Sequence, residues 1–261
     1  MRGLIKDELS ARFQPIYDVD SRIVFALEGL IRGPAGSVVE DPDKLFEAAE
    51  RNEMTVGLDQ AAYKAVLSAF NALSWPGKLF LNLLPGTLLG TDRLPVQFRR
   101  AIGDAGLHPS QIVLELNERD PIPDAAAMLN AIDPFLDEGM LLSLDDVGSG
   151  FSNMRLICEL QPNFLKIDRF FMAGLSQSAA KQSAVRHLIR LALDMGAQVI
   201  AEGVEQEQDA LLAKELGISL MQGFLFGRPT ANPGLLKLPP STFGRSSGRS
   251  PQPLRLPDTR P

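Results

Sequence analysis

The chain has 261 residues, of which 45% are hydrophobic and 22% are charged, so it has a globular composition and room for one large domain or two small ones. Its net charge of −6 and pI near 5.1 exclude a general attraction to nucleic-acid polymers or to anionic membranes. One cysteine, Cys158, excludes an intrachain disulfide, and no stretch approaches the ~20 apolar residues of a membrane helix, so we expect a cytoplasmic protein without membrane insertion.

Short runs typical of β-strands alternate along the chain with longer runs of helical periodicity. The predicted strands are residues 12–17, 23–31, 79–83, 112–116, 141–144, 164–167, 199–201 and 219–221. The predicted helices are residues 43–52, 58–73, 96–105, 124–138, 179–195 and 205–216, and four of them are followed by the glycines expected at helix C-termini, namely Gly106, Gly139, Gly196 and Gly217. Eight strands, mostly followed by helices, predict an α/β fold of the (β/α)8 TIM-barrel type.

The first two strands depart from that pattern. Only residues 18–22 separate them, and this connection is too short for a crossover helix. The two strands should therefore pair as an antiparallel hairpin. The sequence predicts a modified (β/α)8 barrel with one antiparallel strand near the N-terminus.

The composition changes near Pro239. Ser, Pro, Gly and Arg dominate residues 241–261, and no apolar period survives there. We therefore predict one domain over residues 1–238 and a disordered Pro/Ser/Arg-rich tail over residues 239–261.

Polar residues stand where the predicted strands end. Asp145 and Asp146 follow the apolar run at 141–144, and two adjacent carboxylates repel each other unless a cation or a proton lies between them. The other strands are followed or ended by Glu28, Asn82, Glu115 with Glu118 beyond it, Lys166 with Asp168, Glu202, and Gln222. A single polar residue after a strand is usually a loop residue or a helix cap, but this pattern recurs after nearly every strand. In a barrel these ends meet at the face where active sites lie.

The residue types indicate which metal such a site would hold. Carboxylates and an Asn carbonyl are hard oxygen donors, which suit Mg²⁺ or Mn²⁺, with Ca²⁺ as an inhibitory occupant. Neither His108, in a turn, nor His187, in a helix, belongs to a cluster, so zinc is disfavoured. Adjacent aspartates can serve two ions ~3.5–4 Å apart, the spacing of two-metal phosphoester enzymes. Lys166 either pairs with an aspartate or stabilises charge on phosphate and positions water.

These residues also carry a family resemblance. The signature Glu28-Gly29-Leu30 and the segment that begins Asp145-Asp146 occur in order with the segments at 14–16, 81–83, 115–118, 166–168, 202–205 and 222–229. Over residues 12–229 the chain resembles the EAL-domain cyclic-di-GMP phosphodiesterases. The resemblance implies a modified barrel, hydrolysis of cyclic di-GMP to linear pGpG in bacterial signalling, and a homodimer.

The resemblance also implies roles for individual positions. It implies metal ligands at Glu28, Asn82, Glu115, Asp145, Asp146 and Asp168, with Asp145 bridging two ions. It implies catalytic roles for Lys166, Glu202 and Glu118, the last as the anchor of the loop after the aspartate pair. It implies substrate contacts from Gln14, Arg32, Glu205 and Gln222.

The chain departs from the family pattern at three positions. Gly29 replaces the usual Ala, Val147 replaces the usual Phe in the loop expected after the aspartates, and Ser149 replaces the usual Thr. Every expected metal-ligand position is filled, which favours an enzyme over the alternative of a non-hydrolysing EAL module that binds cyclic di-GMP or a protein. A barrel glycosidase would need only two acids, and it leaves Asn82 and Lys166 unexplained.

Overall fold

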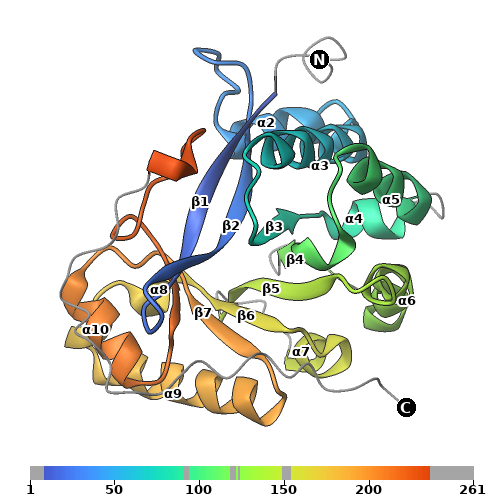
Figure 1. Ribbon diagram of the computed structural model, residues 1–261. Helices are drawn as coiled ribbons and strands as arrows, with labels where there is room; N and C mark the ends of the chain where they lie inside the picture. Colours follow the sequence, from blue (N-terminus) through green and yellow to red (C-terminus); the bar gives the residue numbers. More distant parts are fainter. Residues whose placement is uncertain (1–8, 91–93, 118–121, 123, 149–153, 236–261) are drawn as a thin grey trace.

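The strands of the computed structural model, which describes residues 9–90, 94–117, 122, 124–148 and 154–235, form a closed eight-stranded barrel in chain order (Figure 1). They are β1 (Ser10–Asp18), β2 (Ile23–Arg32), β3 (Lys78–Asn82), β4 (Ile112–Asn117), β5 (Leu141–Val147), β6 (Phe164–Ile167), β7 (Gln198–Ala201) and β8 (Leu220–Gln222). Strands β2 to β8 run parallel, and β1 is antiparallel to both of its neighbours, β2 and β8. The modified barrel expected from the sequence is confirmed.

The predicted hairpin at the start of the barrel is also confirmed. Asp18 closes the turn between β1 and β2, because its Oδ1 accepts from the backbone N–H of Asp20 at 2.9 Å and its carbonyl accepts from Arg22 N at 2.8 Å. Arg22 has φ +62°, the left-handed conformation that such a short reversal requires.

Helices surround the barrel in Figure 1. They are α2 (Pro42–Glu50), α3 (Thr55–Ala72), α4 (Pro85–Leu89), α5 (Leu94–Asp104), α6 (Ala125–Leu136), α7 (Met154–Leu160), α8 (Arg169–Met172), α9 (Ala179–Asp194) and α10 (Glu207–Glu215), with 3₁₀ turns at Pro109–Gln111, Leu175–Gln177 and Pro233–Leu235. All six predicted helices are present, with ends that differ by at most three residues. The short helices α4, α7 and α8 were not predicted, because one or two turns are too short to show a helical period.

The prediction for the end of the fifth strand needs correction. The strand was expected to stop at residue 144, but β5 continues through Asp145 and Asp146 to Val147. Val147 is fully buried and lies opposite Ile167 in β6, so it belongs to the core and not to a loop. In the sequence, two carboxylates after an apolar run look like the end of a strand. The positive charge that Asp145 contacts belongs to Lys166 in β6, so the sequence of β5 does not show it.

Two layers of side chains fill the barrel. The lower layer is apolar and takes one residue from each strand, and its members are Ile16, Ala26, Phe80, Val113, Leu141, Phe164, Ile200 and Leu220. Its rings pack edge to face, with 5.2 Å between the centroids of Phe80 and Phe164. Because side chains alternate along a strand, the residue two positions further towards the open end points inward as well. That step defines the polar layer described below.

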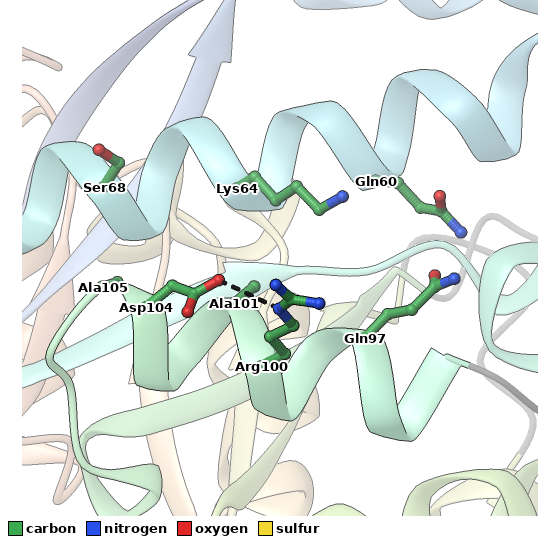
Figure 2. A pocket seen from close by; sticks show the side chains of 8 residues that line it. All are labelled: Gln60, Lys64, Ser68, Gln97, Arg100, Ala101, Asp104 and Ala105. Carbon is green, nitrogen blue, oxygen red and sulfur yellow. Dashed lines mark ion pairs between the residues drawn. The ribbon is translucent and has the colours of Figure 1, made fainter.

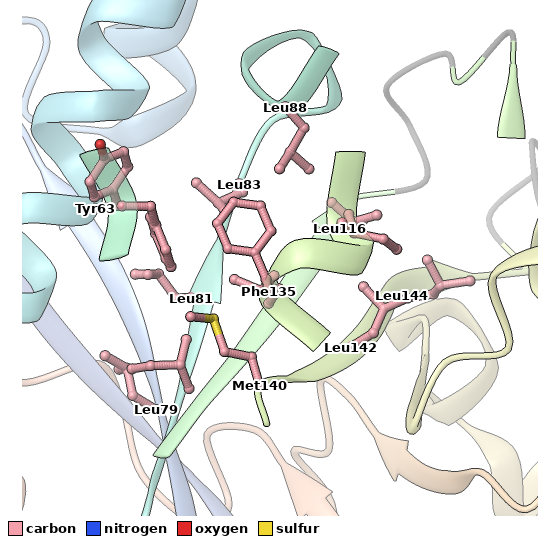
Figure 3. Packing of buried hydrophobic residues seen from close by; sticks show 14 of the residues in the cluster. Tyr63, Leu79, Leu81, Leu83, Leu88, Leu116, Phe135, Met140, Leu142 and Leu144 are labelled. Atoms are coloured by element: carbon pink, nitrogen blue, oxygen red, sulfur yellow. The ribbon is translucent and has the colours of Figure 1, made fainter. Parts of the chain in front are cut away.

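The outward faces of the strands pack against the helices. Leu79, Leu81 and Leu83 alternate with the inward Phe80 and with Asn82, and Figure 3 shows them beside residues of α6 and β5 in a continuous buried cluster. The helices therefore hold the strands from outside, while the polar layer occupies the inside. The predictions for Glu118, Ser149 and the tail at 239–261 concern residues outside the described ranges, and they stay predictions.

The glycine of the family signature, Gly29, lies where β2 packs on α3. A Cβ added to Gly29 would lie 2.2 Å from Val66 Cγ1, so Val66 occupies the space that the usual alanine would fill. Gly29→Ala is expected to destabilise the fold by about 1–3 kcal/mol, because valine on a helix has little rotamer freedom to move aside.

Urea unfolding of Gly29→Ala, Val66→Ala and the double variant measures this contact. The double variant is expected to be more stable than the sum of the single effects predicts, since the new methyl fills the space left by Val66. Additive effects would show that the two positions do not compete for one space.

Candidate metal centre and substrate cavity

The polar layer lies directly above the apolar layer of the barrel. Its members lie two positions from the apolar layer member of each strand, in the strand or, for Glu202, directly after β7. These residues are Gln14, Glu28, Asn82, Glu115, Ser143, Lys166, Glu202 and Gln222. Asp145 follows Ser143 on the same face of β5. The structure thus brings together most of the site residues expected from the sequence, from all eight strands.

Lys166 lies at the centre of this layer with a fully buried side chain. Its Nζ lies 2.6 Å from Glu202 Oε1, 2.8 Å from Glu115 Oε1, 3.2 Å from Asp145 Oδ1 and 3.6 Å from Glu28 Oε2. One ammonium group is therefore shared by four carboxylates. A buried charge needs such partners, because it loses the water that would otherwise solvate it.

Burial and the neighbouring charges shift the pKa of Glu115, Glu202, Asp145 and Lys166. Burial raises the pKa of Glu115 well above its usual range, and burial together with the Asp145 charge does the same for Glu202. Burial acts in the same direction on Asp145, but Lys166 and several hydrogen bonds hold its pKa below the usual range. Burial opposes the charged form of Lys166, but the surrounding carboxylates raise its pKa well above the usual range. The site therefore favours the protonated forms of Glu115, Glu202 and Lys166 and the ionised form of Asp145.

The carboxylates nearest the open end form a group that could hold a cation. One oxygen from each of Asp145, Asp146 and Glu202 lies within 4.8 Å of the others. Asp146 has φ +56°, and it is held in that conformation from two sides. Its backbone N–H donates to Asp145 Oδ1 at 2.8 Å, and its Oδ2 accepts from Asn117 Nδ2 at 3.2 Å. Asn117 was given no role from the sequence, although it lies between two predicted site residues.

The amide side chains fix the opposite side of the layer. Asn82 Nδ2 donates to Glu28 Oε1 at 3.3 Å, and Gln222 Nε2 donates to Glu28 Oε2 and, at 3.2 Å, to Gln14 Oε1. Gln14 Nε2 in turn donates to the carbonyl of Gly227 at 3.1 Å. These contacts hold Glu28 with both oxygens at defined positions.

The remaining site residues expected from the sequence lie further out. Asp168 caps α8, since its Oδ1 accepts from Phe170 N at 2.7 Å, and it is not in the group formed by Asp145, Asp146 and Glu202. Glu205 is exposed in the loop after β7. Arg32 ends β2, and its Nη1 donates to the carbonyl of Ile31 at 2.7 Å.

The donor set fits hard divalent cations. Oε2 of the fully buried Glu115 has no hydrogen-bond partner among the described residues, so one ligand oxygen is left for another positive group. Carboxylate oxygens and an amide carbonyl are the ligands that Mg²⁺, Mn²⁺ and Ca²⁺ prefer. In the described part of the chain, neither histidine lies among them, because His108 begins a 3₁₀ turn and His187 contacts Ser183 within α9.

A cavity of about 410 Å³ opens beside the polar layer. Glu28, Asn82 and Asp145 line one part of it, together with Asn117. The other part is lined by residues of α2 and α3 that include Phe46, Asp59 and Tyr63, and Arg32 also lines the cavity. No sequence pattern had singled out Phe46, Asp59 or Tyr63, because within a helix they read as ordinary face residues.

A second cavity, of about 580 Å³, lies outside the barrel. Figure 2 shows it between α3 and α5, with Gln60, Lys64 and Ser68 on one side and Gln97, Arg100 and Asp104 on the other. Arg100 Nε lies 3.6 Å from Asp104 Oδ2, and both side chains are largely exposed. None of the expected site residues lines this cavity.

In the part of the chain that the structure describes, no helix is both long and apolar enough to cross a membrane. Fold and site together define a class: a TIM-type barrel whose open end holds a group of carboxylates around a buried lysine. Within that class the chain belongs to the EAL domain family, because the model of this family matches residues 1–229.

Known proteins of similar sequence agree with this family. The chain is 28% identical over 233 residues to the cyclic di-GMP phosphodiesterase NbdA of Pseudomonas aeruginosa, with 87% of this chain and 30% of NbdA covered. It is 27% identical over 233 residues to the cyclic di-GMP phosphodiesterase RocR of the same organism, with 88% of this chain and 59% of RocR covered. The chain therefore spans less than two thirds of either relative.

A solved structure of similar fold also agrees with membership of the EAL domain family. The Klebsiella pneumoniae protein BlrP1, in a complex with calcium and cyclic di-GMP, matches with a TM-score of 0.80 and 30% identity over 87% of this chain and 57% of that one. BlrP1 has also been solved with manganese and the same nucleotide.

Proposed function

We propose that the chain hydrolyses cyclic di-GMP to linear pGpG. The observation that supports this function best is the polar layer itself, in which four carboxylates from four strands share one buried lysine beside a cavity of about 410 Å³. Membership of the EAL domain family and the similarity to NbdA, RocR and BlrP1 favour the same substrate.

We propose that Glu28, Asn82, Glu115, Asp145, Asp146 and Asp168 would hold two ions of Mg²⁺ or Mn²⁺. Two observations support cations in this layer: one oxygen from each of Asp145, Asp146 and Glu202 lies within 4.8 Å of the others, and Glu115 Oε2 has no hydrogen-bond partner among the described residues. When bound, such ions lower the pKa of water and stabilise charge on phosphate oxygens.

The protein side chains supply the rest of the chemistry. Lys166 directs its ammonium into the layer, where it can orient the attacking water and stabilise charge that develops on the phosphate. Glu202 Oε1 lies 2.6 Å from Lys166 Nζ, and its carboxyl group is placed to exchange a proton within the layer. Glu118 is proposed to anchor the loop after β5. Arg32 lines the cavity and offers a guanidinium for a phosphate. Gln14 and Gln222 in the polar layer and Glu205 in the loop after β7 are proposed to contact the nucleotide.

Metal removal tests this function. EDTA is expected to abolish turnover of cyclic di-GMP, and Mg²⁺ or Mn²⁺ is expected to restore it, because the layer has hard oxygen ligands. Ca²⁺ should support nucleotide binding but little turnover. Turnover that survives EDTA would contradict the metal mechanism.

The alternative is an EAL module that binds cyclic di-GMP without hydrolysing it. Binding without turnover in both Mg²⁺ and Mn²⁺ would favour that alternative. A homodimer is also proposed from the family resemblance, and light scattering at several protein concentrations tests it.

A further inference from the structure

The second cavity, between α3 and α5, plays no part in the proposed function, and its lining is positively charged. Figure 2 shows Lys64 on α3 and Arg100 on α5 at facing sides of this cavity. Asp104 is the only acidic residue among the described residues that line it, so two cations face one carboxylate in a chain whose net charge is −6. The volume of about 580 Å³ is typical of small-molecule sites.

The open space follows from the side chains that α5 presents to α3. The two helices pack together through buried rings, with 5.0 Å between the centroids of Tyr63 and Phe98. Further along the chain, Ala101 and, directly after α5, Ala105 line the cavity, and their side chains are too short to fill it. The cavity therefore lies between two packed helices, which hold the backbone of its charged residues in place.

The two cations of the cavity have only weak partners within it. Arg100 Nε lies 3.6 Å from Asp104 Oδ2, which is longer than a hydrogen bond, and an ion pair between such exposed side chains contributes little. Lys64 Nζ lies 5.9 Å from the centroid of the Tyr63 ring, near the outer limit of a cation–π contact. Both charges are therefore available to an anionic ligand.

Neutral donors flank the two cations. Gln60 and Gln97 lie towards one end of the cavity, and Ser68 lies towards the other (Figure 2). Their amide and hydroxyl groups can each donate a hydrogen bond. A ligand that matches this lining carries about two negative charges and several acceptor oxygens. A phosphate group has both, whereas a single carboxylate has one charge and two oxygens.

We propose that the cavity between α3 and α5 is a second binding site, in which Lys64 and Arg100 hold the phosphate group of a small molecule. The guanidinium can bind two phosphate oxygens at once, and the ammonium adds a point charge. This inference does not rest on the proposed function, because none of the residues that line this cavity belongs to the polar layer or to the substrate cavity.

NMR titration of the isotope-labelled chain in EDTA tests this site. The probes are inorganic phosphate, glycerol phosphate and acetate at matched ionic strength, and the signals followed are the backbone amides of α5, which lines only the second cavity. The main variant is Lys64→Gln/Arg100→Gln. Its matched control is Lys44→Gln/Arg190→Gln, which removes the same charges elsewhere, and Arg190 also has an aspartate, Asp194, four residues further along its helix.

Wild type is expected to show saturable shifts of the α5 amides with both phosphate probes and about tenfold weaker binding of acetate. Lys64→Gln/Arg100→Gln should bind phosphate at least about tenfold more weakly, and the control should match wild type. Asp104→Asn should bind about threefold more tightly, because it removes the carboxylate that competes for Arg100, whereas Asp194→Asn should have no effect.

Tighter binding of glycerol phosphate than of inorganic phosphate would assign the site to a phosphomonoester, and equal binding would assign it to free phosphate. The absence of saturable α5 shifts would overturn this inference, as would equal phosphate affinity of wild type and Lys64→Gln/Arg100→Gln. Acetate that binds as tightly as phosphate would also overturn it. Asp104→Asn keeps both cations, so unchanged or weaker phosphate binding by this variant would contradict the site even if the double variant does not fold.

Discussion

Replacing Lys166 by methionine is expected to lower kcat for cyclic di-GMP by about 10²–10⁴-fold while nucleotide affinity stays within about threefold. Methionine keeps the buried stem above Phe80 and Phe164 but removes the only ammonium that contacts Glu115, Glu202, Asp145 and Glu28 among the described residues. Charge that develops on the phosphate in the transition state would then lose its nearest protein cation.

The same substitution has a predicted structural effect. Removing one partner of a buried charge cluster commonly costs about 3–5 kcal/mol, so the melting temperature of Lys166→Met in EDTA should fall. Mn²⁺ should restore much of the lost melting temperature, because its positive charge replaces that of the ammonium group. Steady-state kinetics, nucleotide titration and melts with and without Mn²⁺ measure these effects, with the exposed Lys44→Met as control. Normal turnover by Lys166→Met would remove Lys166 from the mechanism.

Replacing Glu28 by alanine is expected to lower activity in a different way, through weaker metal binding. Both carboxylate oxygens of Glu28 are positioned by amides, Oε1 by Asn82 and Oε2 by Gln222, at the entrance of the cavity. If Glu28 is a metal ligand, its loss should weaken Mn²⁺ binding by about 100-fold or more, since even the groups that orient metal ligands are worth 10–100-fold.

Activity measured against Mn²⁺ concentration separates the two variants. The Glu28→Ala curve should shift to higher metal concentration and regain part of its maximum, whereas the Lys166→Met curve should keep a low maximum at any metal concentration. Glu47→Ala, on the exposed face of α2, is the matched control. An unshifted metal dependence for Glu28→Ala would exclude Glu28 as a ligand.

The sequence predicted the barrel, its antiparallel start and most of the polar layer, for a physical reason. An inward side chain recurs every second residue along a strand, so the polar residue that follows each apolar run points to the barrel interior. Gln14, Glu28, Asn82 and Lys166 all lie two positions from an apolar layer residue.

Other features of the site have no local signal in the sequence. The sequence could not show that Asp145 and Asp146 lie inside β5, because Lys166, which contacts the buried Asp145, comes from β6. Asn117 binds Asp146 only through the pairing of β4 with β5. Residues of α3 line the cavity because α3 packs on β2 and β3, and contacts between distant elements are not encoded in the periodicity of either one.

Product analysis tests the central claim most directly. The purified chain is incubated with cyclic di-GMP and Mn²⁺ in ¹⁸O-labelled water. The nucleotides are then separated, and their masses are measured by mass spectrometry. We predict linear pGpG that carries one ¹⁸O atom on its terminal phosphate, because water opens one phosphodiester bond. Intact cyclic di-GMP bound to a folded, metal-loaded chain would contradict the account.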